Sequence, residues 1–504
     1  MPELGEILAG RGVGAHRGWP RLEVDAAGWT AAGEALGQGR LTLLGLWGDD
    51  GPAVHLAVLD EAGARAAVLT LACPDGSFPS IGRLHPPAIR PERTVQDLFG
   101  LTPVDAPDGR PWLDHGRWGV RRPLGACIET SPAGEAYDFL PVEGASLHRI
   151  PVGPVHAGII EPGHFRFTCN GETVVRLEAR LGYVHKGIEG LMRGATLARA
   201  AGLAGRISGD STVAYALAFA RAAETALGIE PPPRAVLLRA LMAELERLAN
   251  HLGDIGAICN DAAFALMLAH CGVLRERVLR ASDLAFGHRL MRDRIVPGGV
   301  TADLGEPGAA AIRALLAEVA ARFPALIDLY DNTASLQDRT VATGRLDPEL
   351  ARRFGAGGYV GRASGRAFDA RRAFPYPPYD RLSFEVPVLD DGDVNARVWV
   401  RIREVEQSLS LVRQILELLP DGPVRVPVEP AGEPREAAAM VEGFRGDILL
   451  WIRLGAAGRV ERCHPRDPSW FQWPLLEAVI ENNIVADFPL CNKSFNCAYS
   501  GHDL

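Results

Sequence analysis

Ser208, Asp210 and Ser211 form a group of side chains that could do chemistry, because a carboxylate lies between two hydroxyls where a helix over residues 209–228 is predicted to begin. The helix dipole and the free backbone amides at such a start favour the charged form of Asp210. The same residues also fit a structural interpretation, in which a serine caps the helix and Asp210 is an acid of its first turn. The sequence leaves both interpretations open.

A second group lies in a predicted β-hairpin over residues 163–178 that turns at an Asn-Gly pair. His164 is a candidate proton donor in this hairpin, with Glu161 and Arg166 close by in sequence to support it. Further polar candidates are His156, His185, Arg206 and Tyr215. Each also has a structural interpretation: hydrogen-bonded histidines, an ion-pairing arginine and a tyrosine packed in the core.

The eight cysteines are scattered, and no CxxC pair occurs. Cys463 and His464 stand alone, while Cys491 and Cys497 lack the spacing of metal ligands. We therefore expect no metal site and no iron–sulfur cluster in this chain, since a cluster needs a set of cysteines that is missing here. The pattern is typical of reduced thiols in a cytosolic protein.

The composition predicts a globular protein with a large core. The chain has 504 residues, of which 47% are hydrophobic and 23% are charged, so it has room for two or more domains. Its net charge of -9 argues against nucleic acid as the main partner. We expect no transmembrane segment, because the best candidate, residues 211–229, is interrupted by Arg221 and Glu224. The N-terminus shows no export signal.

The order of apolar runs and turn signals predicts an α+β fold in two domains. Residues 1–120 form a small α+β domain, 121–147 a linker rich in proline and arginine, and 148–504 a large, mainly helical domain with flanking small β-sheets. The predicted helices cover about 17–38, 91–99, 187–200, 209–228, 259–293, 307–338, 396–419 and 473–485, together with one that begins after Pro231–Pro233. No dinucleotide-binding or phosphate-binding glycine motif occurs.

Three sets of motifs carry a resemblance to known families. Residues 150–156, 161–166 and 183–189 resemble the large subunit of formate hydrogenlyase-type enzymes, which are energy-converting hydrogenase-related complexes. Segments 362–365, 369–372, 379–381 and 392–397 resemble the 49-kDa quinone-site subunit of complex I, and 441–447 resembles a segment that both families share. Residues 79–83 and the signature Glu92-Arg93-x-x-x-Asp97-Leu98-Phe99-Gly100 resemble the 30-kDa subunit of complex I. The resemblance thus implies a fusion of the 30-kDa and 49-kDa subunits.

This resemblance implies an inherited nickel–iron pocket that lacks its ligands. In hydrogenase large subunits the segment that matches residues 206–211 reads Arg-x-Cys-Gly-x-Cys, and its thiolates hold the metal. Here Ser208 and Ser211 stand at both sulfur positions, and Tyr215 stands at the position of a histidine. A serine oxygen is a harder and far less acidic donor than a thiolate, so it replaces one poorly at nickel.

The second pair of thiolates should lie in the tail of the chain. One register places the two cysteine positions at Ala498 and Gly501, and the other places them at Cys497 and Ser500. Either register leaves at most one thiolate of four. We therefore expect no nickel–iron centre and no hydrogen turnover.

In complex I the same cavity binds a quinone headgroup, which needs groups able to protonate two oxygens. Quinone is therefore a candidate ligand, with His164, Glu161 and Asp210 as the expected catalytic residues. The expected cofactor-binding residues are His156, Arg166, His185, Arg206, Ser208, Ser211 and Tyr215. One feature departs from complex I, because the tyrosine that its members place at the next helix would fall near Gly205.

The resemblance implies the large subunit of a membrane-associated, complex I-like oxidoreductase. Electrons would pass from a small iron–sulfur partner subunit to a quinone-type or other acceptor, coupled to ion translocation by antiporter-like and quinone-site-type membrane subunits. The chain would lie on the cytoplasmic face of the cell membrane, and NAD would bind to another subunit of such a complex. The alternative is a non-catalytic scaffold that joins the iron–sulfur arm to the membrane arm. A third interpretation, an active hydrogenase with a rearranged site, would require nickel.

Overall fold

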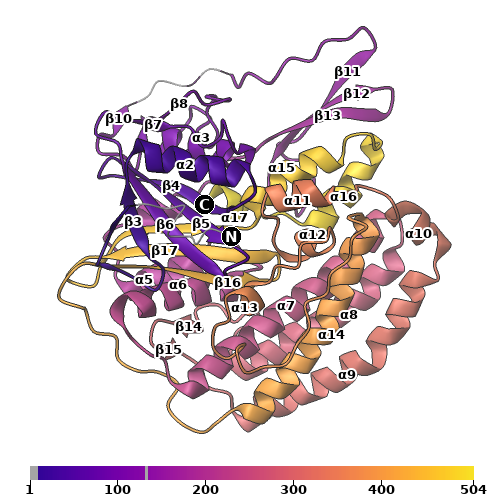
Figure 1. Cartoon of the computed structure of the whole chain (residues 1–504). Helices are drawn as coiled ribbons and strands as arrows, with labels where there is room; N and C mark the ends of the chain where they lie inside the picture. Colours follow the sequence, from indigo (N-terminus) through magenta and orange to yellow (C-terminus); the bar gives the residue numbers. More distant parts are fainter. Residues whose placement is uncertain (1–9, 131–133, 135) are drawn as a thin grey trace.

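The computed structural model describes residues 10–130, 134 and 136–504. Figure 1 shows a β-rich part beside a bundle of long helices, with a small three-stranded sheet projecting from the body. Helices and strands are thus gathered in separate regions, so the fold is of the α+β class that the sequence predicts.

The first sheet belongs to the N-terminal part and has the strand order β1-β3-β6-β5-β4. Its strands are β1 (Arg11–Gly12), β3 (Arg21–Val24), β4 (Thr42–Asp49), β5 (Ala53–Asp60) and β6 (Arg65–Ala72). Helices α2 (Ala26–Gly37) and α3 (Ile89–Phe99) pack against β3, β6 and β4. The predicted helix over 17–38 is therefore only partly correct, because β3 pairs in parallel with β6 and only α2 is helical.

The second sheet has the order β18-β17-β16-β2 and joins the two ends of the chain. It consists of β16 (Arg435–Gly443), β17 (Gly446–Leu454), β18 (Val460–Arg466) and the short N-terminal strand β2 (His16–Arg17), which runs parallel to β16. Leu44 and Trp47 of the first sheet pack with Leu449 and Trp451 of the second in one buried cluster. The N-terminal part therefore shares a hydrophobic core with the C-terminal strands.

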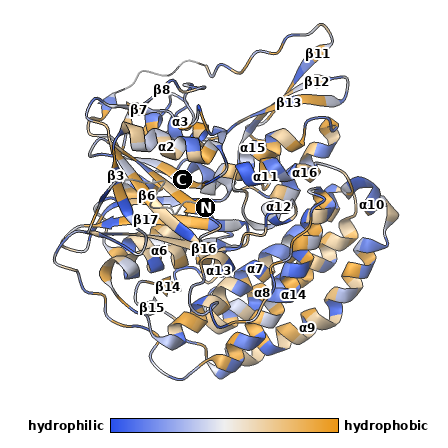
Figure 2. Cartoon of the chain, viewed as in Figure 1, coloured by the Kyte–Doolittle hydropathy of each residue, from blue (hydrophilic) through white to orange (hydrophobic). Residues whose placement is uncertain are grey.

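Five long helices form the helical part. They are α6 (Thr212–Leu227), α7 (Pro233–Asp261), α8 (Ala265–Phe286), α9 (Glu306–Asp331) and α14 (Val394–Leu418). α7 packs against α8 and α14, α9 packs against α8, and α6 lies against β16 and β17. Figure 2 shows hydrophobic and hydrophilic residues side by side around these helices, as amphipathic packing requires. The predicted helix over 259–293 is divided, because Ala263 takes a left-handed backbone conformation between α7 and α8.

The projecting sheet consists of β11 (Leu147–Val152), β12 (His164–Asn170) and β13 (Thr173–Arg180), with β12 in the middle. The shorter helices are α4 (Ile188–Met192), α5 (Leu197–Ala204), α10 (Ala334–Thr340), α11 (Pro348–Arg353), α12 (Gly358–Arg362), α13 (Ala370–Ala373), α15 (Ser469–Val479), α16 (Phe488–Phe495) and α17 (Tyr499–Asp503), with 3-10 turns η1 (Pro86–Ala88) and η2 (Val485–Asp487). The remaining strands are β7 (Ser77–Pro79), β8 (Thr102–Val104), β9 (Val120–Arg121), β10 (Glu129–Thr130), β14 (Ile295–Val296) and β15 (Gly299–Val300). Within the described ranges, no helix combines the length and the apolar character needed to cross a membrane.

Candidate functional site

The carboxylate of Asp210, just before α6, forms a two-point ion pair with Arg445, which lies in the turn between β16 and β17. Arg445 Nη1 donates to Asp210 Oδ1 over 2.7 Å, and Nη2 donates to Oδ2 over 2.5 Å. Both neighbouring serines donate their hydroxyls to the same carboxylate, Ser208 over 2.8 Å and Ser211 over 3.3 Å. The group that the sequence singles out is thus a compact polar cluster, and its serines point at a carboxylate.

The ion pair holds Asp210 in its charged form. Burial alone would raise the pKa of Asp210, but the guanidinium of Arg445 and the hydroxyl of Ser208 outweigh burial and lower the pKa to about 2. Arg445 is itself buried, and its pKa is raised because Asp210 faces it. At neutral pH Asp210 and Arg445 therefore carry opposite charges that neutralise each other.

Arg445 also ties this cluster to the tail of the chain. Its Nε donates to the backbone carbonyl of Asn496 over 2.5 Å, immediately before Cys497. Three segments that are far apart in sequence, around Asp210, Arg445 and Asn496, therefore meet at one guanidinium. The tail and the start of α6 converge, as the resemblance to a hydrogenase scaffold requires.

The start of α6 is capped by a residue of another helix. Ser211 occupies the N-cap position but makes no side-chain capping hydrogen bond. Glu246 of α7 instead accepts from the amides of Val213 over 2.7 Å and Ala214 over 3.1 Å. Burial raises the pKa of Glu246 to about 8. The serine hydroxyls are therefore not used as caps, and they remain part of the polar cluster around Asp210.

Tyr215, one turn into α6, donates its hydroxyl to the buried carboxylate of Asp467. Asp467 also lies against Gly501 of the tail, where an added Cβ would stand 2.4 Å from Asp467 Oδ2. A side chain at position 501 would therefore collide with this carboxylate. Asp467 takes the space next to one of the two tail positions where a metal-binding cysteine would be expected.

The donors gathered here do not fit a nickel–iron centre. Where the resemblance implies the first two thiolates, the chain has the hydroxyls of Ser208 and Ser211, and the thiol of Cys497 in the tail is buried. Burial raises the pKa of Cys497, which keeps it protonated at neutral pH. The cation of Arg445 faces the same place. Among the described residues, no group of three or more histidine, cysteine or acidic side chains could hold a metal ion.

The loop between β11 and β12 brings two further candidates against the tail. Glu161 accepts from the amide of Ser500 over 3.0 Å, and His156 Nε2 lies 3.3 Å from the hydroxyl of Tyr499. Arg166 on β12 stacks its guanidinium on Phe139 at 3.9 Å. Glu161 and His156 therefore hold α17 in place from one side.

His164 is the first residue of β12, and one nitrogen of its part-buried ring has no hydrogen-bond partner among the described residues. Its Nδ1 lies 3.3 Å from the carbonyl of Gly153, which can only accept, so Nδ1 carries the proton. Its Nε2 is buried and has no partner in the part of the chain that the structure describes. Burial lowers the pKa of His164, so the ring is neutral at pH 7 and Nε2 is an acceptor. In this state His164 accepts a proton rather than donating one.

Arg206 and His185, two of the expected cofactor-binding residues, lie away from the polar cluster around Asp210. Arg206 is on the surface, where it pairs with Asp293 over 2.7 Å. His185 stacks on Trp118 and lies with Nδ1 2.7 Å from the carbonyl of Asp503, at the wall of a separate cavity. No hydrogen bond or ion pair between described residues links His164 directly to Asp210. The tail contacts both the loop between β11 and β12 and the Asp210 cluster, and so lies between them.

Sequence reasoning missed three residues of the cluster: Arg445, Glu246 and Asp467. Arg445 lies inside the motif at residues 441–447, so the resemblance offered a signal for it. Glu246 and Asp467 carry no local signal, because they reach the cluster from α7 and from the turn after β18.

Comparisons with known proteins agree with the motifs. Residues 261–436 match the family model described as respiratory-chain NADH dehydrogenase, 49 Kd subunit. The chain is 32% identical over 436 residues to formate hydrogenlyase subunit 5 of Escherichia coli (strain K12), covering 84% of this chain and 77% of the relative. It is 30% identical to hydrogenase-4 component G of the same organism, covering 90% and 80%.

A complex I relative matches over a shorter part. An NADH-quinone oxidoreductase subunit from Dehalococcoides mccartyi (strain ATCC BAA-2266 / KCTC 15142 / 195) is 32% identical, covering 67% of this chain and 92% of the relative. The alignment of 436 residues with the formate hydrogenlyase protein is longer than residues 148–504, so it must include part of the N-terminal region. The resemblance that the motifs indicate is confirmed.

Proposed function

The chain belongs to the family of complex I 49-kDa subunits and hydrogenase large subunits, and from this premise we propose that it is the large subunit of a membrane-associated, complex I-like oxidoreductase without a functional nickel–iron centre. It would receive electrons from a small iron–sulfur partner subunit and pass them to a quinone-type or other acceptor. Antiporter-like and quinone-site-type membrane subunits would couple this reaction to ion translocation, with the chain bound peripherally on the cytoplasmic face of the membrane. NAD would bind elsewhere in such a complex.

The observation that supports this proposal best is the donor set around Asp210. Two hydroxyls, one protonated thiol and a guanidinium are a poor set of ligands for nickel, which needs soft anionic donors. The same set would suit a polar organic acceptor that takes over hydrogen bonds which Ser208, Ser211 and Arg445 donate to Asp210. We therefore assign electron transfer without hydrogen turnover to this subunit.

Reduction of a quinone consumes two electrons and two protons. The electrons would come from the partner's cluster. His164 is the candidate carrier of one proton, and because its neutral ring has an acceptor nitrogen at Nε2, it must first take up a proton from the loop side before it can donate one. Glu161, in the loop that precedes β12, would relay that proton from the solvent, and the second proton would also come from the solvent.

Elemental analysis of the purified protein tests the central claim. We expect less than one-tenth equivalent of nickel per chain, since thiolate ligands are missing. Stoichiometric nickel together with iron in the isolated chain would overturn the proposal, and would support a rearranged hydrogenase site.

The alternative function, a non-catalytic scaffold, is favoured by one observation. Asp210 already pairs with Arg445 and accepts hydrogen bonds from two serines, and no hydrogen bond or ion pair among the described residues joins it to His164. Electron transfer through the purified complex separates the two functions. A catalytic subunit loses at least tenfold of its quinone- or ferredoxin-dependent rate on His164→Ala or Asp210→Ala, whereas a scaffold keeps normal flux in both variants and fails only when truncation prevents assembly. Arg280→Ala, which breaks only a surface ion pair with Glu276, is the matched control.

A further inference from the structure

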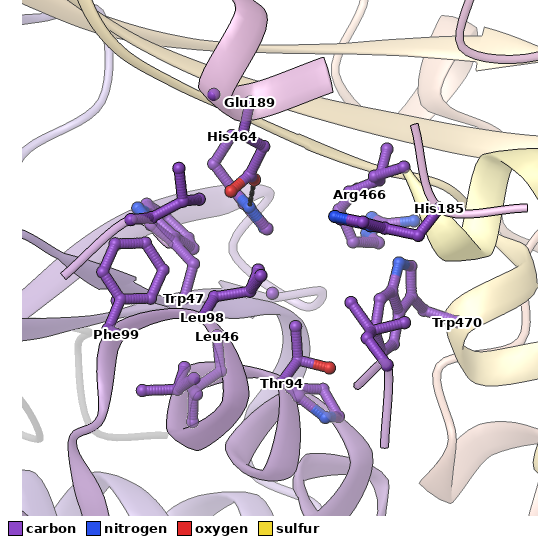
Figure 3. A pocket seen from close by; sticks show the side chains of 18 of the residues that line it. Leu46, Trp47, Thr94, Leu98, Phe99, His185, Glu189, His464, Arg466 and Trp470 are labelled. Atoms are coloured by element: carbon purple, nitrogen blue, oxygen red, sulfur yellow. Dashed lines mark hydrogen bonds and ion pairs between the residues drawn. The ribbon is translucent and has the colours of Figure 1, made fainter. Parts of the chain in front are cut away.

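A cavity of about 150 Å³ lies away from the Asp210 cluster, between the N-terminal and C-terminal parts of the chain. Figure 3 shows it between β4 and α3 on one side and α4, β18 and α15 on the other. Its walls are mainly aromatic and aliphatic, with Trp47, Leu98, Phe99 and Trp470 among them. Apolar cavities of this size can take a molecule as large as a benzene ring.

The charged groups at the cavity neutralise one another. Glu189 pairs with Arg462 over 3.0 Å and with His464 Nδ1 over 2.6 Å. Burial raises the pKa of Glu189, but Arg462 and His464 outweigh burial and lower it, so the carboxylate is charged. Arg466 is likewise engaged by Asp447. A ligand of this cavity therefore needs no charge of its own.

His464 presents an acceptor atom with no partner. Its Nδ1 faces the carboxylate of Glu189 and carries the proton, which leaves a lone pair on Nε2 of the neutral ring. Nε2 is buried and has no partner among the described residues. In Figure 3 the imidazole lies beside Glu189 and faces the space above Leu98. A buried polar atom without a partner is costly, so a ligand that donates a hydrogen bond to it would be favoured.

Donors without partners lie around the same space. The indole nitrogens of Trp47 and Trp470 and the Nε of Arg462 are buried and unpaired among the described residues. Trp47 also stacks on His464 with ring centres 4.8 Å apart. A hydroxyl group that donates to His464 Nε2 keeps two lone pairs with which it can accept from an N–H group of the cavity wall. The wall therefore matches a neutral ring that carries one hydroxyl.

We propose that this cavity is a second ligand site, which binds a neutral, ring-sized apolar molecule bearing a hydroxyl group, with that hydroxyl hydrogen-bonded to His464 Nε2. The site is independent of the proposed electron-transfer function. Its apolar walls bind the ring, and the imidazole selects the hydroxyl.

Calorimetric titration of the full chain with 4-methylphenol, and with toluene as the matched probe without a hydroxyl, tests this proposal. We expect 4-methylphenol to bind with one-to-one stoichiometry and about tenfold more tightly than toluene. His464→Phe should remove this preference and leave toluene binding unchanged, since Glu189 keeps Arg462 as its partner. Equal affinities for the two probes in the unchanged chain, or a preference that persists in His464→Phe, would overturn the proposal.

A filling variant shows whether binding takes place in this cavity. Leu98→Trp should abolish binding of both probes, and Thr94→Phe on the same helix serves as a second filling variant in case the first does not fold. Ala320→Trp, which fills a groove between α9 and α14 instead, is the matched control and should bind normally. Binding that survives in the folded filling variants, or that is absent from the assembled complex because a partner closes the cavity, would also contradict the proposal.

Discussion

At the scale of single residues, the pairing of Asp210 with Arg445 joins the start of α6 to the turn between β16 and β17. A carboxylate and a guanidinium matched by two hydrogen bonds offset much of the cost of burying either charge. Removal of one of the two side chains leaves the charge of the other partly buried and without its ion-pair partner. The cluster is therefore sensitive to single changes in a way that a surface pair is not.

Asp210→Asn should lower the free energy of unfolding by about 2 kcal/mol. This is less than for a fully enclosed pair, because the side chain of Asp210 is 36% exposed. Asp293→Asn, which breaks the surface pair with Arg206, should change the free energy of unfolding by less than about 0.5 kcal/mol. Urea unfolding of the two variants measures the difference. Equal losses of unfolding free energy in the two variants would mean that the Asp210–Arg445 pair contributes no more to stability than the surface pair.

At the scale of the element, the start of α6 depends on a side chain of the neighbouring helix α7. Glu246 reaches from α7 to the first amides of α6, so the packing of the two helices fixes the start of one of them. This contact also makes the helix start depend on pH, since burial raises the pKa of Glu246 to about 8 from an ordinary value of 4.5.

The sign of this pH dependence follows from the raised pKa. A carboxyl whose pKa rises on folding contributes stability that is fully present below pH 4.5 and is lost as the pH rises through about 8. The contribution of Glu246 to the unfolding free energy should therefore fall between pH 4.5 and 8, by up to about 1.4 kcal/mol per pH unit. His16, His55 and His85, whose pKa values burial lowers to about 4, act in the opposite direction below pH 6.5. Glu246→Gln should flatten this slope in urea unfolding measured at several pH values. Glu92 and Glu442, whose pKa values burial raises to about 7, leave a residual slope. An unchanged slope in the variant would exclude Glu246 as its source.

At the scale of the whole molecule, the two sheets share a core although they belong to opposite ends of the chain. Trp47 of β4 and Trp451 of β17 are fully buried, with ring centres 5.7 Å apart. Strand β2 adds to the edge of the C-terminal sheet, next to β16. The N-terminal and C-terminal parts should therefore unfold together.

Trp451→Ala should destabilise the protein by about 4 kcal/mol, because it leaves a cavity in the shared core. Hydrogen exchange followed by mass spectrometry should show protection lost from β5 and β17 at the same denaturant concentration. Val155→Ala, at a residue that is 81% exposed, is the control and should change stability by less than about 0.5 kcal/mol. Loss of protection in β17 alone would show that the two sheets are independent.

The sequence by itself determined the fold class, most of the long helices and the family. These depend on signals that lie within short segments: the apolar spacing of α7 and α14, the proline that starts α7, the Asn-Gly turn of the hairpin, and the motifs that the relatives share. The hydroxyls of Ser208 and Ser211 can likewise be read directly from the residues. Local patterns suffice for such features because each one is set by neighbours in the chain.

Only the tertiary structure decided what these residues contact. Arg445 lies 235 positions from Asp210, and Glu246 caps a helix from a neighbouring one. His185 and Arg206, which the motifs group with the serines, lie elsewhere, and the cavity around His464 is built from both ends of the chain. Long-range contacts of this kind are fixed by the packing of whole elements, so no short pattern contains them.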